Sequence, residues 1–320
     1  MDYKECRSST IINFIAGAIG GTSAAIITCP LEVVKTRLQS SGEVFKPITR
    51  QITSVSTITR IQPEQRIKPN GILGCMRHII NTEGYRSLYK GLGPNLIGVA
   101  PARAVYFAVY VKSSKYIQQK GIVHQDNPLT HMLAGASAGF VTHTLTAPIW
   151  FVKTRLQLSS HKYGMMRCIA KVYKSEGIKG FYRGLSASYF GVVETIIHFV
   201  IYERLKKILR EYHRDNSFDH LEKNQLTDFM LSAGCSKTCA AIFAYPHEVV
   251  RTRLRQETRD KERKYQKFFQ TLVLVYKEEG RPALYGGLGT KLLCQIPNCA
   301  VMFMVYESVV FYLCENDQND

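Results

Sequence analysis

A proline-anchored motif that occurs three times along the chain constrains the fold more than any other feature. The copies are Pro-Leu-Glu-Val-Val-Lys-Thr-Arg-Leu-Gln from residue 30, Pro-Ile-Trp-Phe-Val-Lys-Thr-Arg-Leu-Gln from residue 148 and Pro-His-Glu-Val-Val-Arg-Thr-Arg-Leu-Arg from residue 246. Each copy ends a stretch of apolar and small residues that is roughly twenty residues long, enough to cross a bilayer core. The motif therefore predicts three membrane helices that kink at a proline and carry charge at one end.

The charges of this motif can form a ring if the three helices converge. Glu32 and Lys35 are three residues apart, as are Glu248 and Arg251, so each pair lies on one helix face. Charges near a hydrocarbon slab need partners, so each base can pair with the acid of a neighbouring helix and close one end of a bundle. The alternative is three solvated helix ends, which the threefold repetition argues against. The residues predicted for this inner gate are Glu32, Lys35, Gln39, Lys153, Gln157, Glu248 and Arg251.

A second motif also occurs three times, each time downstream of a proline motif. It starts with Glu-Gly at residues 83, 176 and 279 and ends with glycine at residues 91, 184 and 287. Repeats of this kind build one domain, residues 1–320, and not three separable ones. The predicted repeats are about 11–118, 129–213 and 226–315, with a loop insertion in the first at about 42–70.

The two motifs resemble those of the mitochondrial carrier family, and the resemblance covers nearly the whole chain. It implies an all-α membrane protein with six transmembrane helices in three pseudo-repeats, the mitochondrial carrier fold. Even-numbered spans are expected at about 93–118, 186–213 and 289–315, and short membrane-surface helices near 72–82, 165–175 and 268–278. The proline motif then ends the odd-numbered spans.

The formal net charge of +17 calls for an anionic partner. Nucleic acid is not expected, because the bases are spread along three repeats beside glycine-rich apolar stretches and do not gather on one face. Nine cysteines occur without a paired Cys-x-x-Cys arrangement, so no metal site is predicted. We identify no catalytic residue set and no cofactor motif, and we expect a transporter that is not an enzyme.

The basic residues also predict the orientation. Most of them lie between the proline motif and the second motif of each repeat, whereas the opposite connections near 119–128 and 211–225 carry few. By the positive-inside tendency the basic side faces the matrix of the mitochondrion. The resemblance thus implies a multi-pass protein of the inner membrane with both termini toward the intermembrane space.

The resemblance places a substrate site on the even-numbered spans, seven residues after the glycine that ends the second motif. An apolar slot at Gly191 and Val192 suits a base ring, and Arg103 can pair with phosphate. The alternatives are helix packing for the glycines and an ion pair between Arg103 and Glu194. The predicted substrate residues are Gly98, Arg103, Tyr106, Gly191, Val192, Glu194, Lys291, Cys294, Gln295 and Asn298.

Two further sites follow from the resemblance. An outer gate is expected at Tyr110, Tyr202, Glu203, Lys206, Tyr306 and Glu307, although only the second copy of its motif is complete. Cardiolipin is expected at the helix starts marked by Lys90, Gly91, Arg183 and Gly184, because helix N-termini attract anions. The alternative at these corners is a turn glycine beside a snorkelling base.

The segment around Trp150, which occupies an acid position of the inner gate, looks like the pyrimidine nucleotide carriers of this family. Gly-Val-Ala-Pro-Ala-Arg from residue 98 and Gln-Ile-Pro-Asn from residue 295 support this resemblance. The expected function is exchange of UTP, CTP, TTP and the diphosphates between cytosol and matrix, by alternating access and as a monomer. The alternatives are a carrier of the FAD, folate or NAD type, and a membrane regulatory protein that no longer transports.

Overall fold

Six long helices and three shorter ones make up most of the structure. The computed structural model describes residues 10–40, 71–120, 128–159, 163–215, 221–256 and 264–316, and within these ranges every regular element is helical. The predicted loop insertion at 42–70 lies outside the described residues. The long helices are α2 (Thr10–Gln39), α4 (Leu92–Gln119), α5 (Pro128–Leu158), α7 (Leu185–Asp215), α8 (Leu221–Arg255) and α11 (Leu288–Asn316).

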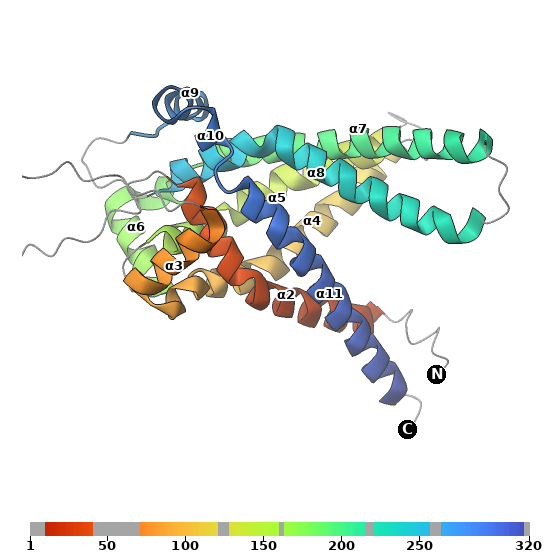
Figure 1. Cartoon of the computed structure of the whole chain (residues 1–320), viewed down its shortest axis with the longest axis horizontal. Helices are drawn as coiled ribbons and strands as arrows, with labels where there is room; N and C mark the ends of the chain where they lie inside the picture. Colours follow the sequence, from red (N-terminus) through yellow and green to blue (C-terminus); the bar gives the residue numbers. More distant parts are fainter. Residues whose placement is uncertain are drawn as a thin grey trace, which may run out of the picture.

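The short helices gather at one end of the bundle (Figure 1). They are α3 (Gly71–Glu83), α6 (Met165–Gly180) and α9 (Phe268–Glu279), with a 3₁₀ turn η2 (Tyr85–Tyr89) after α3 and the single turn α10 (Arg281–Leu284) after α9. Each follows an odd-numbered span and precedes an even-numbered one, as the repeats predict. The odd-numbered spans are α2, α5 and α8, and the even-numbered spans are α4, α7 and α11. The predicted order of elements is therefore the observed one in all three repeats.

The long helices pack in pairs that cross the repeat boundaries. α4 packs along α5, α7 packs along α8, and α11 packs along α2, so the last span returns to the first and closes a ring. Figure 1 shows α2 and α11 side by side, with the start of α2 and the end of α11 at the same end of the bundle. An even number of spans produces this arrangement.

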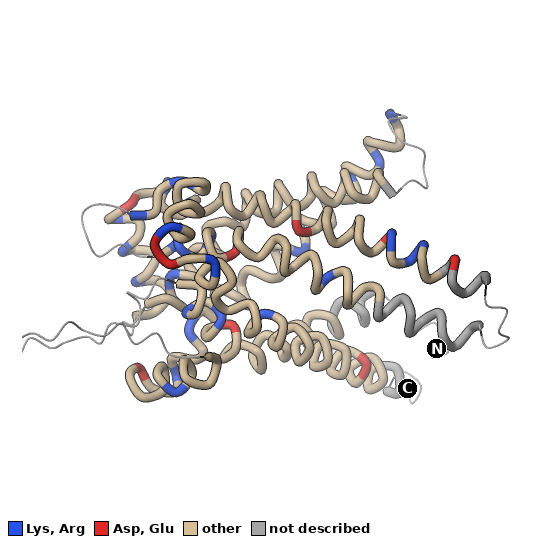
Figure 2. Tube along the Cα trace, turned by 45° about the horizontal axis from the view of Figure 1, so that its top comes forward, with Lys and Arg blue, Asp and Glu red and all other residues tan. Residues whose placement is uncertain are grey.

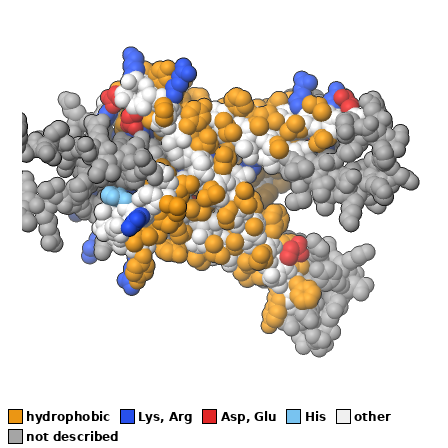
Figure 3. Space-filling model, in the orientation of Figure 1, with side chains coloured by type: hydrophobic (Ala, Val, Ile, Leu, Met, Phe, Trp, Pro, Cys, Tyr) orange, Lys and Arg blue, Asp and Glu red, His pale blue; other side chains and the backbone are white. Residues whose placement is uncertain are grey.

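The outer surface of the bundle is apolar along the middle of the long helices. Figure 3 shows hydrophobic side chains over this part of the visible face, and Figure 2 shows Lys, Arg, Asp and Glu concentrated toward the end that carries the short helices. Among the described residues, three segments are long and apolar enough to span a membrane: Ala16–Gln39, Leu185–Leu209 and Arg281–Leu313. α4, α5 and α8 are of similar length, and all six long helices contribute side chains to a central cavity.

Buried ion pairs attach each short helix to the span before it. Arg37, Arg155 and Arg253 of the proline motif pair with Glu83, Glu176 and Glu279 of the second motif, respectively. These three arginines are among the most buried side chains of the described residues. The arginine and the acid are both repeated three times in the sequence, so each repeat contains one such pair.

Glu83 shows what the first of these pairs does. Arg37 donates from Nη1 and Nη2 to the two carboxylate oxygens at 2.7 and 2.9 Å, and Lys90 donates to Oε2 at 2.6 Å. Burial alone raises the pKa of Glu83, but the hydrogen bonds and charges of Arg37 and Lys90 outweigh it and hold that pKa below its usual range. The carboxylate therefore stays ionised between two cations and locks α3 and η2 onto α2.

Candidate functional site

A cavity of about 630 Å³ lies between the six long helices, and all six contribute to its lining. The lining is strongly basic. Among the described residues, seven cations line it, against one carboxylate, Glu32; the cations are Lys35, Arg103, Lys153, Lys237, Arg251, Arg255 and Lys291. A solute that fits this cavity therefore has to be an anion.

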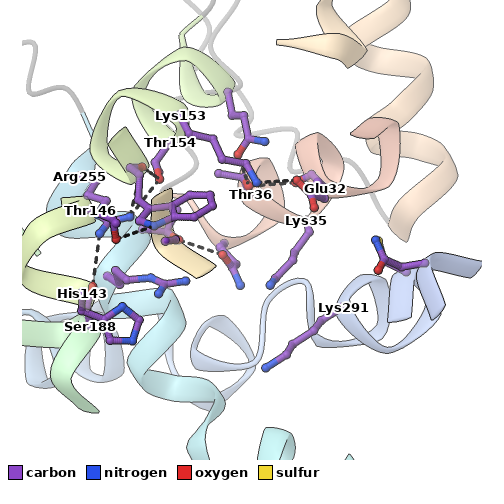
Figure 4. A pocket seen from close by; sticks show the side chains of 18 of the residues that line it. Glu32, Lys35, Thr36, His143, Thr146, Lys153, Thr154, Ser188, Arg255 and Lys291 are labelled. Atoms are coloured by element: carbon purple, nitrogen blue, oxygen red, sulfur yellow. Dashed lines mark hydrogen bonds and ion pairs between the residues drawn. The ribbon is translucent and has the colours of Figure 1, made fainter. Parts of the chain in front are cut away.

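Two ion pairs close the floor of the cavity between odd-numbered spans, and Figure 4 shows the one between Lys153 and Glu32. Lys153 Nζ of α5 lies 2.7 Å from Glu32 Oε2 of α2. Lys35 Nζ of α2 lies 2.9 Å from Glu248 Oε2 of α8. Each base thus pairs with the acid of a neighbouring span, which is the pattern predicted for the inner gate.

The predicted glutamines lie directly beside these pairs. Gln39 donates to Glu248 Oε2 at 3.3 Å and accepts a hydrogen bond from Thr252 Oγ1 at 2.9 Å, which ties α2 to α8. Gln157 accepts a hydrogen bond from Thr36 Oγ1 at 2.8 Å, which ties α5 to α2. The glutamines therefore join the same two pairs of spans as the ion pairs do.

On the third side of the gate, between α5 and α8, the described residues supply no carboxylate. Trp150 stands at the acid position, where its Nε1 donates to Thr146 Oγ1 at 3.0 Å and its ring lies 5.3 Å from Lys153 Nζ. Arg251, predicted as the third base of the ring, lines the cavity and forms no ion pair within the part of the chain that the structure describes. The gate is thus closed by charge on two sides only.

Lys291 connects the gate to an even-numbered span. Its Nζ lies 2.9 Å from Glu248 Oε1 of α8 and 3.1 Å from Glu194 Oε1 of α7. Glu194 therefore pairs with Lys291, and the alternative of an ion pair between Glu194 and Arg103 is wrong. Arg103 is exposed to the cavity instead.

The structure separates the predicted substrate residues into two groups. Those that line the basic cavity are Arg103, Tyr106, Lys291, Cys294, Gln295 and Asn298. Those that do not line it are Gly98, Gly191, Val192 and Glu194. Six of the ten predicted positions thus share one cavity, and their role in binding stays a prediction.

Gly98 lies in a helix contact. A Cβ atom at this position would come 2.7 Å from Cγ2 of Ile149, so the glycine lets α4 approach α5 closely. Helix packing, the alternative considered for the glycines, accounts for this position. A Cβ at Gly191 would lie 3.4 Å from Nε2 of His247 on α8.

Val192 lines a separate apolar pocket of about 400 Å³ between α4, α5 and α7. Tyr106 belongs to both hollows and stacks on Tyr110, with ring centroids 6.2 Å apart. Tyr110 in turn contacts His131 of α5, with 2.7 Å between the hydroxyl and Nδ1. The aromatic rings therefore lead from the basic cavity into the apolar pocket.

The outer-gate residues lie far along the even-numbered spans, on the other side of the cavity from the inner gate. Tyr202 stacks on His198 and lies under Lys206, whose Nζ is 5.7 Å from the ring centroid, and these three residues belong to α7 alone. Tyr306 of α11 packs against a small buried cluster with Ala16 of α2. The roles of all six predicted outer-gate residues in a gate stay predictions.

The predicted lipid corners carry less available charge than the sequence indicates. Lys90 pairs with Glu83 and also donates to Ser159 O at 2.8 Å, while Arg183 pairs with Glu176. Gly91 has a φ of 86°, and a Cβ there would come 2.9 Å from Cγ of Gln157. This glycine and its counterpart Gly184 therefore serve the fold as well, and lipid binding at these corners stays a prediction.

Several residues of the site were not identified from the sequence, and Arg255 and Tyr245 are two of them. Arg255 ends the third proline motif, at the position where the first two copies have Gln39 and Gln157, and it lines the cavity. Tyr245 precedes the third proline, accepts a hydrogen bond from Gln39 Nε2 at 3.0 Å and donates to Gly286 O at 2.8 Å. The departure of Arg255 from glutamine was visible in the sequence, whereas nothing in the motif pointed to Tyr245.

A ring of six membrane helices around a basic cavity, closed at one end by ion pairs, defines a solute carrier of membranes. The model of the family described as mitochondrial carrier protein matches residues 7–121, 124–213 and 222–317. The chain therefore belongs to the mitochondrial carrier family. The predicted fold is confirmed, and membership makes the chain a multi-pass protein of the mitochondrial inner membrane.

Curated relatives match over nearly the full chain. The chain is 48% identical over 317 residues to solute carrier family 25 member 36-A of Danio rerio. The aligned region covers 96% of this chain and 99% of the relative. The chain is 46% identical over 321 residues to member 33 of Bos taurus, with 98% of each chain covered. It is 38% identical over 322 residues to the mitochondrial pyrimidine nucleotide transporter RIM2 of Saccharomyces cerevisiae, covering 93% of this chain and 85% of that one.

Proposed function

We propose that this protein transports pyrimidine nucleoside di- and triphosphates across the mitochondrial inner membrane. The observation that carries the proposal is the cavity, whose seven cations exceed the nearby carboxylates Glu32, Glu194 and Glu248 by four charges. A nucleoside triphosphate carries a comparable negative charge. The yeast relative named as a pyrimidine nucleotide transporter narrows the class of anion.

The ion pairs supply a mechanism for transport by alternating access. With the inner gate closed, the cavity admits solute from the opposite end of the bundle. Lys291 and Lys35 both hold Glu248, so phosphate oxygens that attract either lysine weaken the contact of Glu248 with the other spans. Binding of the nucleotide thus lowers the cost of opening the gate, and an empty cavity favours the closed one.

The proposal also covers how the protein is oriented in the membrane and whether one chain is enough for transport. The end with the short helices faces the matrix because Lys and Arg are concentrated there (Figure 2), and both termini then face the intermembrane space. A single chain encloses the cavity with its own six spans, so a monomer is sufficient for exchange. Transport requires no covalent step and no cofactor.

Arg103 tests the identity of the substrate. We expect Arg103→Ala to lower UTP and CTP exchange in liposomes by a factor on the order of ten or more, because a hydrogen bond to a charged group is worth roughly 1.5–3 kcal/mol. Lys207→Gln is the control, since Lys207 is an exposed base of α7 that does not line the cavity. The measurement is uptake of labelled UTP.

The same assay separates the alternatives. Unlabelled pyrimidine nucleotides should compete with labelled UTP better than FAD, folate or NAD do. Stronger competition by one of the latter would transfer the assignment to a carrier of that type. A protein that inserts and folds but exchanges none of these solutes would be a membrane regulator with the carrier fold.

Cardiolipin is the proposed lipid partner. Preferential binding of this lipid to the folded protein should raise the melting temperature of the detergent-solubilised chain. Phosphatidylglycerol is the matched control because it is anionic but carries a single phosphate. Equal shifts with both lipids would reduce the interaction to general attraction between a basic protein and an anionic surface. Gly91→Leu is a poor probe here, since the added side chain would collide with Gln157.

A further inference from the structure

The side of the inner gate between α5 and α8 is the one that lacks an acid. The other two sides are joined by the pairs of Lys153 with Glu32 and of Lys35 with Glu248. On the third side Arg251 lines the cavity, and the described residues provide it with no ion pair. A cation at membrane depth without a counter-charge is costly, so this side calls for an anion.

Arg255 is a second cation on the same side, and the described residues provide it with no carboxylate partner either. Its side chain is only 5% exposed. Its Nη atoms donate to the neutral oxygens Trp150 O, Thr154 Oγ1 and Ser188 Oγ, each at 3.3 Å. Its Nε has no hydrogen-bond partner among the described residues. A buried guanidinium that has only long hydrogen bonds to neutral groups is poorly compensated.

The geometry separates this side from the rest of the cavity floor. Figure 4 shows Arg255 with Thr154 and Ser188 on one side of the cavity, while Lys35 and Lys291 lie on the other. Lys35 and Lys291 already hold Glu248. The uncompensated positive charge of the floor is therefore concentrated toward α5 and α8.

The two guanidinium groups determine the chemistry of the missing anion. Guanidinium presents a planar fork of N–H donors that matches the oxygens of a phosphate or a carboxylate. The chain supplies a tryptophan where its other repeats supply a carboxylate, so the anion comes from a ligand. In a cavity proposed to take nucleotides, that ligand group is a phosphate.

We propose that Arg251 and Arg255 form a second phosphate site on the α5–α8 side of the cavity floor. This site is distinct from Arg103 and binds a terminal phosphate of the nucleotide. This phosphate stands in for the acid that Trp150 replaces. The identity of the nucleotide rests on the proposed function, whereas the anion site rests on the two arginines. The site makes affinity depend on the number of phosphates, because a monophosphate held at Arg103 has no terminal group to place between α5 and α8.

The test compares ligands that differ only in phosphate number. Purified full-length protein in detergent is titrated with UTP, UDP, UMP and inorganic pyrophosphate, and dissociation constants are obtained from calorimetry. We expect Arg251→Gln to weaken UTP binding on the order of tenfold or more and to change UMP binding much less. Lys237→Gln is the matched control, because Lys237 is a cation of the same helix and cavity but lies away from the gate motif. It should weaken UTP and UMP by similar factors.

A second variant tests the site without removing an arginine. Trp150→Glu puts a carboxylate where the other repeats have one, so it should pair with Arg251 and occupy the site. We expect this variant to lose pyrophosphate binding and the preference for UTP over UMP. It decides the question if Arg251→Gln does not fold.

The outcomes separate this inference from the proposed function. Pyrophosphate binding that depends on Arg251 in a protein that binds no pyrimidine nucleotide would support the site and overturn the function. UTP binding that keeps its preference over UMP in both variants would overturn the site and leave the function. Equal weakening of UTP and UMP by Arg251→Gln also overturns it, since the arginine then acts on the gate alone. Pyrophosphate that binds together with UTP, without competing, would assign the site to a free anion and not to the substrate.

Discussion

The substitution Glu248→Gln is expected to reduce nucleotide exchange in liposomes by at least about tenfold. Glu248 pairs with two lysines, Lys35 of the gate and Lys291 of α11, both at 2.9 Å. Its side chain is 10% exposed, so in the variant water can solvate the two unpaired lysines only poorly. Removal of one partner from a buried pair costs about 3–5 kcal/mol, and partial exposure of Lys35 places this site toward the lower end. The closed gate then loses much of its stability, and the two-state cycle loses one state.

Glu32→Gln provides a graded comparison for this prediction. Glu32 pairs with Lys153 alone and is 26% exposed, so its loss should slow exchange less than the loss of Glu248. The reciprocal variant Glu32→Lys with Lys153→Glu restores the pair with opposite sign and should recover part of the exchange. Normal exchange by Glu248→Gln, with insertion verified, would mean that the ion pairs do not control the gate.

The fold could be predicted because its determinants are local and occur three times. The proline motif and the second motif mark the ends of spans, and the apolar stretches between them have the length of a membrane helix. The short surface helices followed from their mixed basic and apolar pattern, and they appear as α3, α6 and α9. Three copies of one pattern also predict a ring, since each repeat must present the same faces to its neighbours.

The contacts inside the ring could be predicted only in part. Adjacent acids and bases indicate that Lys35 pairs with an acid of another span, but the order of helices around the ring decides that this acid is Glu248. Counting along an even-numbered helix put Gly98 in the substrate site, yet its exact rotation turns it toward Ile149. Lys291 was predicted as a substrate residue, and the sequence carries no sign that it reaches both Glu194 and Glu248. Such contacts depend on helix rotation and separation, which spacing alone leaves open.

The substitution Glu279→Gln should destabilise the fold far more than the same substitution at its neighbour, Glu278. Glu279 accepts hydrogen bonds from both Nη atoms of Arg253, whose side chain is 0% exposed. Without the acid, this guanidinium keeps Gln39 O and the Tyr265 hydroxyl as partners but has no counter-charge. Breaking a buried pair of this kind costs about 3–5 kcal/mol.

Glu278→Gln is a matched control because it makes the same chemical change one residue away. Glu278 pairs with Lys264, and both side chains are 43% exposed, so this pair contributes about 0–1 kcal/mol. Melting curves of the two purified variants in one detergent provide the measurement, and Glu279→Gln should melt several degrees lower. The difference is expected to appear as loss of the contact between α9 and α8, since Arg253 belongs to α8 and Glu279 ends α9. Equal melting temperatures for the two variants would show that the arginine–glutamate pairs of the repeats do not hold the short helices in place.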